Sequence, residues 1–474
     1  MLFNTLDYAK FFAAAFVVYW LLLRHKLARM VFLLAASYAF YAGWNWRYLP
    51  LILLSSTMDF WLASRIDREP DQAARKRWLW ITVVVNLSLL GFFKYWNFAL
   101  ETVDWVARGR GVHLSTEKWL LQLALPVGIS FYTFESMSYV IDVYRRDMPA
   151  ERSYLRYLLF VAFFPHLVAG PIVRPKDLLP QFDRLPSLDR TIGGEGMFLV
   201  AMGLLKKVCI GDYLGLNLVD RVFDRTTSFS GLETLFGVYG YALQIYCDFS
   251  GYTDIAIGSA LLLGIRINEN FRSPYQSSSL QEFWKRWHIS LSTWLRDYLY
   301  ISLGGNRGGK WKTYRNLMLT MLLGGLWHGA SWTFVVWGLL HGVGLALQRA
   351  KDDLFGAPKG PTPWFLRVVF GLATFHFVCF AWIFFRAPTF AKAEEVIRQI
   401  ASGTTFHPNL PPKLLAVMAL GLVTHLLPHD WLQRMKAGFV ALPFPAQAGV
   451  LFCGAVALHE MAQSAALPFV YFQF

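Results

Sequence analysis

Residues 317–340 read LMLTMLLGGLWHGASWTFVVWGLL, an apolar run that contains no Asp, Glu, Lys or Arg. A helix that crosses a membrane needs roughly 20 mainly apolar residues. The surrounding window, 315–349, is long enough to hold a bend or a pair of helices, and so is the window 232–263. These runs predict an all-α chain whose helices lie in a lipid bilayer.

Windows of the same kind recur along the chain, near residues 8–23, 30–45, 48–64, 78–95, 119–141, 155–172, 194–212, 364–386, 412–427 and 446–466. We therefore expect a polytopic membrane protein with about 11 to 13 transmembrane or partial membrane helices, some of them re-entrant or interfacial. Residues 1–474 are expected to form a single domain. The first window is expected to be retained as an anchor, because no Lys or Arg precedes Lys10 as in a signal peptide.

The composition agrees with this class of protein. Hydrophobic residues make up 55% of the chain and charged residues 16%. Soluble domains average about 25% charged residues, so an ordinary soluble domain is excluded. Disorder is excluded too, because so apolar a chain buries enough surface to fold. The four cysteines are far apart and form no CxxC pair, so neither a disulfide framework nor a metal site is expected.

The formal net charge of +14 predicts which side of the membrane the loops occupy. Lys and Arg prefer the cytoplasmic side, so the charge needs no nucleic-acid partner. Basic residues follow the first, third and fifth windows, at Arg24, Lys26, Arg29, Arg65, Arg68, Arg75, Lys76, Arg77, Arg145, Arg146, Arg152 and Arg156. The N-terminus is therefore predicted to be extracytoplasmic, and the stretch 266–315, here called the basic segment, is predicted to face the cytoplasm.

Aromatic, basic and hydroxyl residues alternate most densely within this basic segment. Ser279 and Glu282 have the spacing of a capping box, which predicts that a helix begins at Ser279. Apolar and aromatic residues then recur at helical spacing, at Trp284, Trp287, Leu291, Trp294, Leu295, Tyr298 and Leu299. Two structures fit the pattern: an interfacial amphipathic helix anchored by tryptophans, or a half-buried helix that lines a cavity.

Three histidines are candidates for chemistry. His328 lies within the apolar run quoted above, where an ionisable side chain is costly and is a functional candidate by default. Its neutral imidazole could act as a general base. His288 lies in the preceding polar island and is expected to orient or polarise a reactant, and His376 lies mid-span. The alternative for each is a packing residue with one hydrogen-bond partner.

Two further motifs have a structural and a functional interpretation. Residues 304–310, GGNRGGK, satisfy the first seven positions of a phosphate loop, but Trp311 stands where the metal-binding hydroxyl belongs. We expect a flexible turn, in which Arg307 or Lys310 could contact phosphates. Asp248 and Asp254 lie beside hydroxyl residues, and a polar network that braces a bent helix is favoured over a metal or cation site.

Several motifs together resemble the membrane-bound O-acyltransferase (MBOAT) family, and within it the bacterial alginate-type O-acetyltransferases and teichoic acid D-alanyl transfer proteins. The two with the clearest resemblance are RWHISLS, Arg286–Ser292, and LWHG, Leu326–Gly329. The others, from a core motif region of about 120–345 and from the closing residues, are Pro126–Phe134, Phe164–Ile172, Asp248–Ile257, Glu269–Phe271 and Tyr471–Phe474.

The resemblance implies an MBOAT fold, in which tilted helices form a ring around a central cavity and the basic segment, 266–315, forms a cytoplasmic funnel segment. It also implies that His328 is the catalytic histidine and that His288 occupies an upstream Asn-or-His position of the family. His376 matches a third histidine of this branch more loosely. Positions expected to support the pair are Trp327, Arg286 and Ser290. No metal and no bound cofactor are expected.

The implied activity is O-acyl transfer in the bacterial inner membrane, from a cytoplasmic acyl-CoA such as acetyl-CoA toward hydroxyls of an alginate-like polysaccharide outside. A periplasmic partner protein is expected to accept or use the acetyl group. Direct attack by a hydroxyl and a covalent acyl relay both fit. A transporter and a non-catalytic scaffold are alternatives; transporters often contain internal repeats with broken helices, and the 281–303 pattern has no second copy.

Overall fold

The computed structural model describes residues 1–112, 114, 116–121, 124–168, 170–356, 360, 362–462 and 469. Ala169 and the closing residues Tyr471–Phe474, which belong to two of the quoted motifs, lie outside the described residues. Within the described ranges the secondary structure is helical and contains no β-strand. The all-α class predicted from the apolar windows is confirmed.

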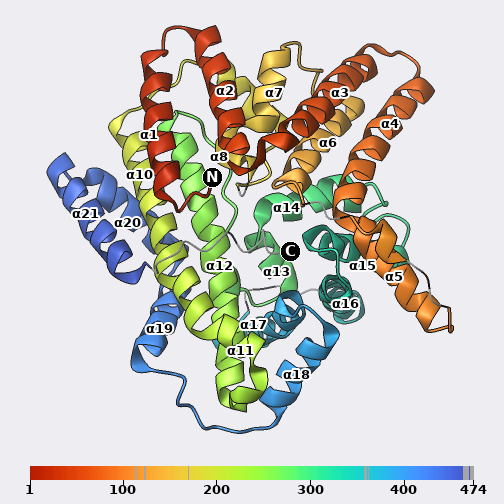
Figure 1. Cartoon of the computed structure of the whole chain (residues 1–474), viewed down its shortest axis with the longest axis vertical. Coiled ribbons are helices and arrows are strands. Elements are labelled where there is room, and N and C mark those ends of the chain that lie inside the picture. The colour runs from red at the N-terminus through yellow and green to blue at the C-terminus, as the bar shows by residue number, and fades with distance from the viewer. Residues whose placement is uncertain are drawn as a thin grey trace.

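The N-terminal third forms one group of helices (Figure 1). Its members are α1 (Leu6–Leu21), α2 (Lys26–Asn45), α3 (Leu49–Arg68), α4 (Gln72–Leu90), α5 (Trp96–Arg108), α6 (Ile129–Arg145) and α7 (Tyr154–Ala162). Helix α3 packs against both α4 and α6. A π-helical segment, Gly91–Tyr95, joins α4 to α5. The predicted window 155–172 is broken, because α7 ends at Ala162 and the short α8 (Phe164–Leu167) follows.

The long helix α12 (Gly231–Leu262) runs through the middle of the molecule beside α10 (Arg190–Leu204) (Figure 1). A Cβ atom on Gly251 would lie 2.6 Å from the carbonyl oxygen of Gly203, and one on Gly258 would lie 2.6 Å from that of Gly196. Small residues let membrane helices approach this closely. The window 232–263 is therefore one continuous helix, held by backbone contact with α10.

Ion pairs join α12 to the π-helical segment Leu205–Asp212, which continues α10. Lys206 contacts Asp254 at 2.6 Å, and Lys207 contacts both Asp212, at 2.6 Å, and Asp248. The acids that the sequence singled out thus belong to a polar network, as predicted, but this network joins two packed helices instead of bracing a bent one.

The predicted helix at Ser279 begins as expected, since the Ser279 side chain accepts a hydrogen bond from the Glu282 amide. It does not continue to Leu299. Helix α13 (Leu280–Arg286) stops, and α14 (Ile289–Trp294) begins anew after a break at Trp287 and His288. The Arg272 amide donates to the Arg286 carbonyl, and the Ile289 amide donates to the Asn270 carbonyl. Pairing with the segment 270–272 replaces the helical hydrogen bonds at the break. The apolar periodicity of the sequence does not reveal this pairing.

The window 315–349 is a pair of helices, α15 (Lys310–His328) and α16 (Trp332–Phe355). They pack with their backbones in contact: a Cβ on Gly325 would lie 2.4 Å from the Phe334 carbonyl oxygen, and one on Gly338 would lie 2.4 Å from that of Met321. In Figure 1, α13 and α14 lie near the centre, between α12 and this pair.

The C-terminal part contains α17 (Trp364–Arg386), α18 (Phe390–Ala401), α19 (Pro412–Leu426), α20 (His429–Ala441) and α21 (Phe444–Met461). Within the described residues, three segments are long and apolar enough to cross a membrane: Lys26–Arg68, Gln72–Arg108 and Trp364–Arg386. Helices α19 and α20 pass the same test together, with a bend of 94° between them. Several apolar helices therefore support a multi-pass membrane protein, and the full number of membrane elements stays a prediction.

The glycine contacts between α10 and α12 can be tested with Gly251→Ala. The new methyl group would press on the Gly203 carbonyl, and overpacking of this kind costs about 1 to 3 kcal/mol. We expect a lower thermal unfolding temperature for the purified protein in detergent. The matched control is Gly193→Ala on α10, whose Cβ would meet only the Leu188 side chain at 3.6 Å. Equal unfolding temperatures for the two variants would contradict the proposed backbone packing.

Candidate active site

His328 is the last residue of α15, at the point where the chain turns toward α16. Its side chain is buried and surrounded by aromatic rings, with ring centres 5.0 Å away at Trp327 and Trp337 and 5.3 Å away at Phe385. A Cβ on the next residue, Gly329, would lie 2.1 Å from the Phe334 ring. The turn after His328 therefore requires glycine, which accounts for the LWHG sequence.

His288 lies next to His328 although α14, a π-helical segment (Leu295–Tyr300), the glycine turn and nearly all of α15 separate them in sequence. Their ring centres are 6.5 Å apart, and the His288 ring is fully buried. His288 precedes α14 with a φ of +42°, a left-handed conformation that few non-glycine residues adopt. Strained backbone of this kind is concentrated at functional sites. The break in the helix thus places the second histidine beside the first.

Hydrogen bonds determine the tautomer of His288. The Asn270 side-chain oxygen accepts hydrogen bonds from the Ser290 amide, at 3.1 Å, and from the Ser290 hydroxyl, at 2.9 Å. Since a backbone amide can only donate, this Asn270 atom is an acceptor. His288 Nδ1, which lies 3.2 Å from it, must therefore carry the proton of their hydrogen bond. Nε2 then holds a lone pair, and it has no hydrogen-bond partner among the described residues. His288 in this state can accept a proton but cannot donate one from Nε2.

The hydrogen bonds continue from Ser290 to the loop that follows α8. The Ser290 hydroxyl accepts from the Ile172 amide at 3.0 Å, and the next amide, that of Val173, donates to the Glu135 carboxylate at 3.0 Å. Glu135 is in turn 3.0 Å from His166, and both side chains are buried. Three of the quoted motifs therefore meet around the histidine pair, because each supplies one part of this network.

A cavity of about 580 Å³, here called the histidine cavity, opens against His328. Its walls come from the start of the chain, from α2 and from the 124–131 segment, together with Lys94, Val168, Trp327 and His328. Lys94 carries the only charged side chain among the described residues that line it, apart from the histidine itself. The His328 side chain at the end of α15 can therefore be reached from the histidine cavity.

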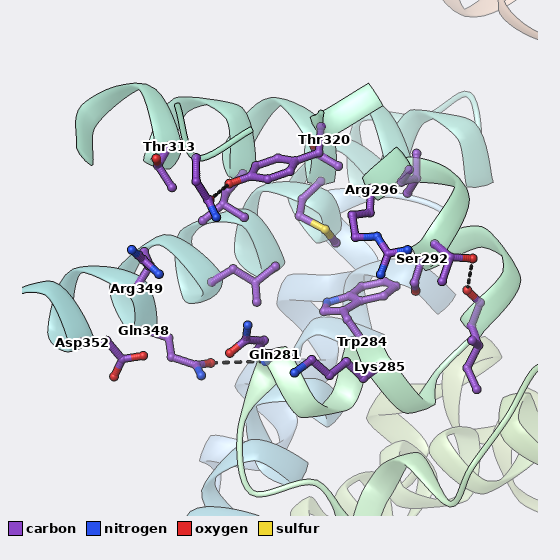
Figure 2. A pocket seen from close by; sticks show the side chains of 18 residues that line it. Gln281, Trp284, Lys285, Ser292, Arg296, Thr313, Thr320, Gln348, Arg349 and Asp352 are labelled. Atoms are coloured by element: carbon purple, nitrogen blue, oxygen red, sulfur yellow. Dashed lines mark hydrogen bonds between the residues drawn. The ribbon is translucent and has the colours of Figure 1, made fainter. Parts of the chain in front are cut away.

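A second cavity, here called the basic cavity, has a volume of about 540 Å³ and lies along α13, α14, α15 and α16. Figure 2 shows Lys285, Arg296 and Arg349 around it, with Trp284 in its wall and Asp352 at its edge. A hydrogen bond to Asp297 raises the pKa of Arg296, so this guanidinium remains charged. Helices α13 and α14 therefore line a cavity, which confirms the second of the two structures expected for the basic segment.

The other predicted site residues fall into two groups. Trp327 and Ser290 lie at the histidine pair, with the Trp327 ring centre 6.1 Å from that of His288. The remaining residues do not. Arg286 pairs with Glu282 at 2.8 Å within α13, and His376 is exposed on α17, where it contacts the Tyr239 hydroxyl at 2.9 Å. The structure therefore does not bring His376 to the histidine pair.

Arg307 and Lys310 are exposed at the glycine turn, and neither lines the basic cavity. Lys310 donates to the Asp353 carbonyl at 3.3 Å, which ties the turn to the end of α16. A contact between these residues and a phosphate stays a prediction. Lys285, Arg296 and Arg349 are the cations that the basic cavity presents instead.

Sequence reasoning overlooked two residues, Lys94 and Asn270. Lys94 interrupts an apolar window, GFFKYW at 91–96, and an ionisable residue in such a window is a functional candidate by the rule that identified His328. Asn270 was visible only as part of the Glu269–Phe271 motif. Its role depends on the fold, because the loop that carries it must lie beside the break at His288.

Comparisons with known proteins agree with this geometry. The MBOAT family, described as the membrane-bound O-acyltransferase family, matches residues 146–387, which include both histidines. The chain is 48% identical over 361 residues to the probable alginate O-acetylase AlgI of Azotobacter vinelandii, covering 76% of this chain and 70% of that protein. A peptidoglycan O-acetyltransferase of Helicobacter pylori is 38% identical over 433 residues, covering 84% of this chain and 79% of that protein.

A more distant relative is a teichoic acid D-alanyltransferase of Bacillus subtilis, 28% identical over 278 residues, which cover 56% of this chain and 69% of that protein. The names of these relatives describe the transfer of an acetyl group to alginate or peptidoglycan and of a D-alanyl group to teichoic acid. Because the family match spans both histidines and the close relatives align over more than two thirds of their length, this chain belongs to the membrane-bound O-acyltransferase family.

Proposed function

We propose that this protein transfers an acetyl group from acetyl-CoA, bound on the cytoplasmic side, toward hydroxyl groups of a polysaccharide outside the inner membrane. One observation carries the proposal: a single helix, α15, lines the basic cavity at Thr313–Met321 and the histidine cavity at Trp327–His328. An acyl donor and an acceptor could therefore approach the same histidine pair from opposite sides.

The basic cavity suits an acyl-CoA donor. Its three cations could pair with the phosphates of the nucleotide, since charged donors bind phosphate strongly, and Trp284 offers an aromatic face to the base. The preference of Lys and Arg for the cytoplasm supports placing this cavity on the cytoplasmic side. The histidine cavity and the N-terminus would then lie on the extracytoplasmic side.

The histidine pair suits attack by a hydroxyl group on a thioester. His328 would remove the proton as the hydroxyl oxygen bonds to the acyl carbon. The carbon–sulfur bond then breaks, and the imidazolium returns the proton to the CoA thiolate. His288 would orient the acceptor, because its Nε2 can accept but not donate. A side chain that cannot donate a hydrogen bond cannot polarise the acyl carbonyl, so the orienting role is favoured for His288.

The names of the relatives support the acceptor class. Alginate and peptidoglycan are both polysaccharides, and O-acetyl transfer to either forms an ester with a sugar hydroxyl. A polymer outside the membrane is too large to enter a cavity of this size, so we propose that a periplasmic partner protein accepts the acetyl group or presents the sugar. A covalent relay on a histidine is the alternative chemical route.

The first test compares His328→Ala with the wild type. We expect transfer from radiolabelled acetyl-CoA to the polymer fraction of membrane vesicles to fall by about 100-fold or more, the usual contribution of a general base. His288→Gln should lower the rate less, because the amide can still orient a hydroxyl. Unchanged transfer in folded His328→Ala, with loss of transfer when the protein is deleted, would instead indicate a scaffold.

Acid quenching of a single turnover separates the two chemical routes. Direct attack predicts that no label is bound to the protein at any time before product forms. A relay predicts label that is covalently bound to the wild type and absent from the variant of the acylated histidine.

The basic cavity is tested with Lys285→Ala and Arg296→Ala. Each removes a charged partner worth about 1.5 to 3 kcal/mol, so we expect the KM for acetyl-CoA to rise by about 10-fold or more while kcat changes little. Lys312→Ala is the matched control, because Lys312 is an exposed cation on α15, a helix that borders the basic cavity, but does not itself line the cavity. Arg307→Ala and Lys310→Ala test the glycine turn in the same assay. If the KM for acetyl-CoA is unchanged in both Lys285→Ala and Arg296→Ala, the donor does not bind in the basic cavity.

A further inference from the structure

The carboxyl end of α15 is held by two side chains from a distant part of the chain. The last four carbonyl groups of a helix have no partner within the helix itself. In α15, the Tyr95 hydroxyl donates to the Leu326 carbonyl at 2.7 Å, and the Lys94 ammonium donates to the carbonyls of Trp327, at 2.5 Å, and His328, at 3.0 Å. The backbone of His328 is therefore tied directly to Lys94.

The local structure around Lys94 makes this contact specific. Lys94 and Tyr95 both belong to the π-helical segment between α4 and α5, and such segments are frequent at functional sites. The segment lies within the apolar stretch Gln72–Arg108, where an ammonium group is costly unless it finds acceptors. Two carbonyls at the negative end of a helix supply those acceptors. The ammonium also lies 5.9 Å from the centre of the Trp327 ring.

Lys94 also lines the histidine cavity, so it acts where the reaction is proposed to occur. The His328 ring contacts aromatic side chains, whereas Lys94 binds the backbone of the same residue. The ammonium thus adds a polar anchor to the packing that already surrounds the end of α15. Misplacement of a reacting group by 1 Å can cost about 100-fold in rate, so an anchor of this kind affects turnover more than binding.

We propose that Lys94 is a positioning residue for the transfer reaction: by binding the Trp327 and His328 carbonyls it holds the His328 imidazole at the depth where acyl donor and acceptor meet. This inference rests on the proposed function of His328. Tyr95 contributes the third hydrogen bond and acts in the same direction.

The test measures kcat and the KM for acetyl-CoA with the full chain in membrane vesicles. Lys94→Met keeps the length of the side chain but removes its charge and its donors, and we expect kcat to fall by about 10- to 100-fold with KM within about twofold of the wild type. Lys94→Arg keeps the charge and donors and should recover most of the rate. Lys118→Met is the control, because Lys118 is an exposed lysine outside both cavities.

The outcomes separate this inference from the proposed function. If His328→Ala is inactive and Lys94→Met keeps the wild-type kcat, the positioning role is wrong and the proposed function stands. If neither variant loses transfer, the proposed function itself is wrong. A fall in kcat that matches the loss of folded protein, with no recovery in Lys94→Arg, would reduce Lys94 to a structural residue. If Lys94→Met does not accumulate, Lys94→Gln takes its place under the same criteria.

Discussion

The side-chain oxygen of Asn270 accepts three hydrogen bonds from two residues, and the arrangement of the site depends on this atom. The amide and the hydroxyl of Ser290, in the first turn of α14, both donate to this oxygen. His288 Nδ1 donates to it as well, so His288 Nε2 keeps its lone pair. In a helix that continued through residue 288, the Ser290 amide would bond to the Arg286 carbonyl four residues earlier instead of to Asn270. The interruption between α13 and α14 is therefore part of the chemistry.

Much of the fold could be predicted from hydropathy. The bounds of four helices, α1, α2, α17 and α19, nearly coincide with those of the predicted apolar windows. An apolar run of suitable length has few other structures available in a bilayer. The start of α13 was predicted because a capping box is a local signal. The break at His288 was not, because Trp284, Leu291 and Trp294 keep helical spacing across it, and only the distant Asn270 loop reveals why the helix stops.

The site itself was predicted unevenly for the same reason. An ionisable residue in an apolar run is conspicuous, which identified His328. Its relation to His288 followed from the polar island that carries His288 and from resemblance to a family. His376 satisfied the same rule and yet lies on an exposed helix face beside Tyr239. Lys94 also satisfied it and was overlooked. A sequence shows which residues are costly to bury, whereas the fold decides which of them share a cavity.

The path along α15 also bears on how a group crosses the membrane. On α15, Met321 borders the basic cavity and Trp327 borders the histidine cavity. The two residues are six positions apart, or about 9 Å at the usual helical rise. A hydrocarbon layer is about 30 Å thick. If the proposed donor and acceptor occupy these two cavities, a thioester on a flexible arm needs to reach only across the wall between them. An enzyme built in this way would transfer a group across a bilayer without the rocking motion that a carrier requires.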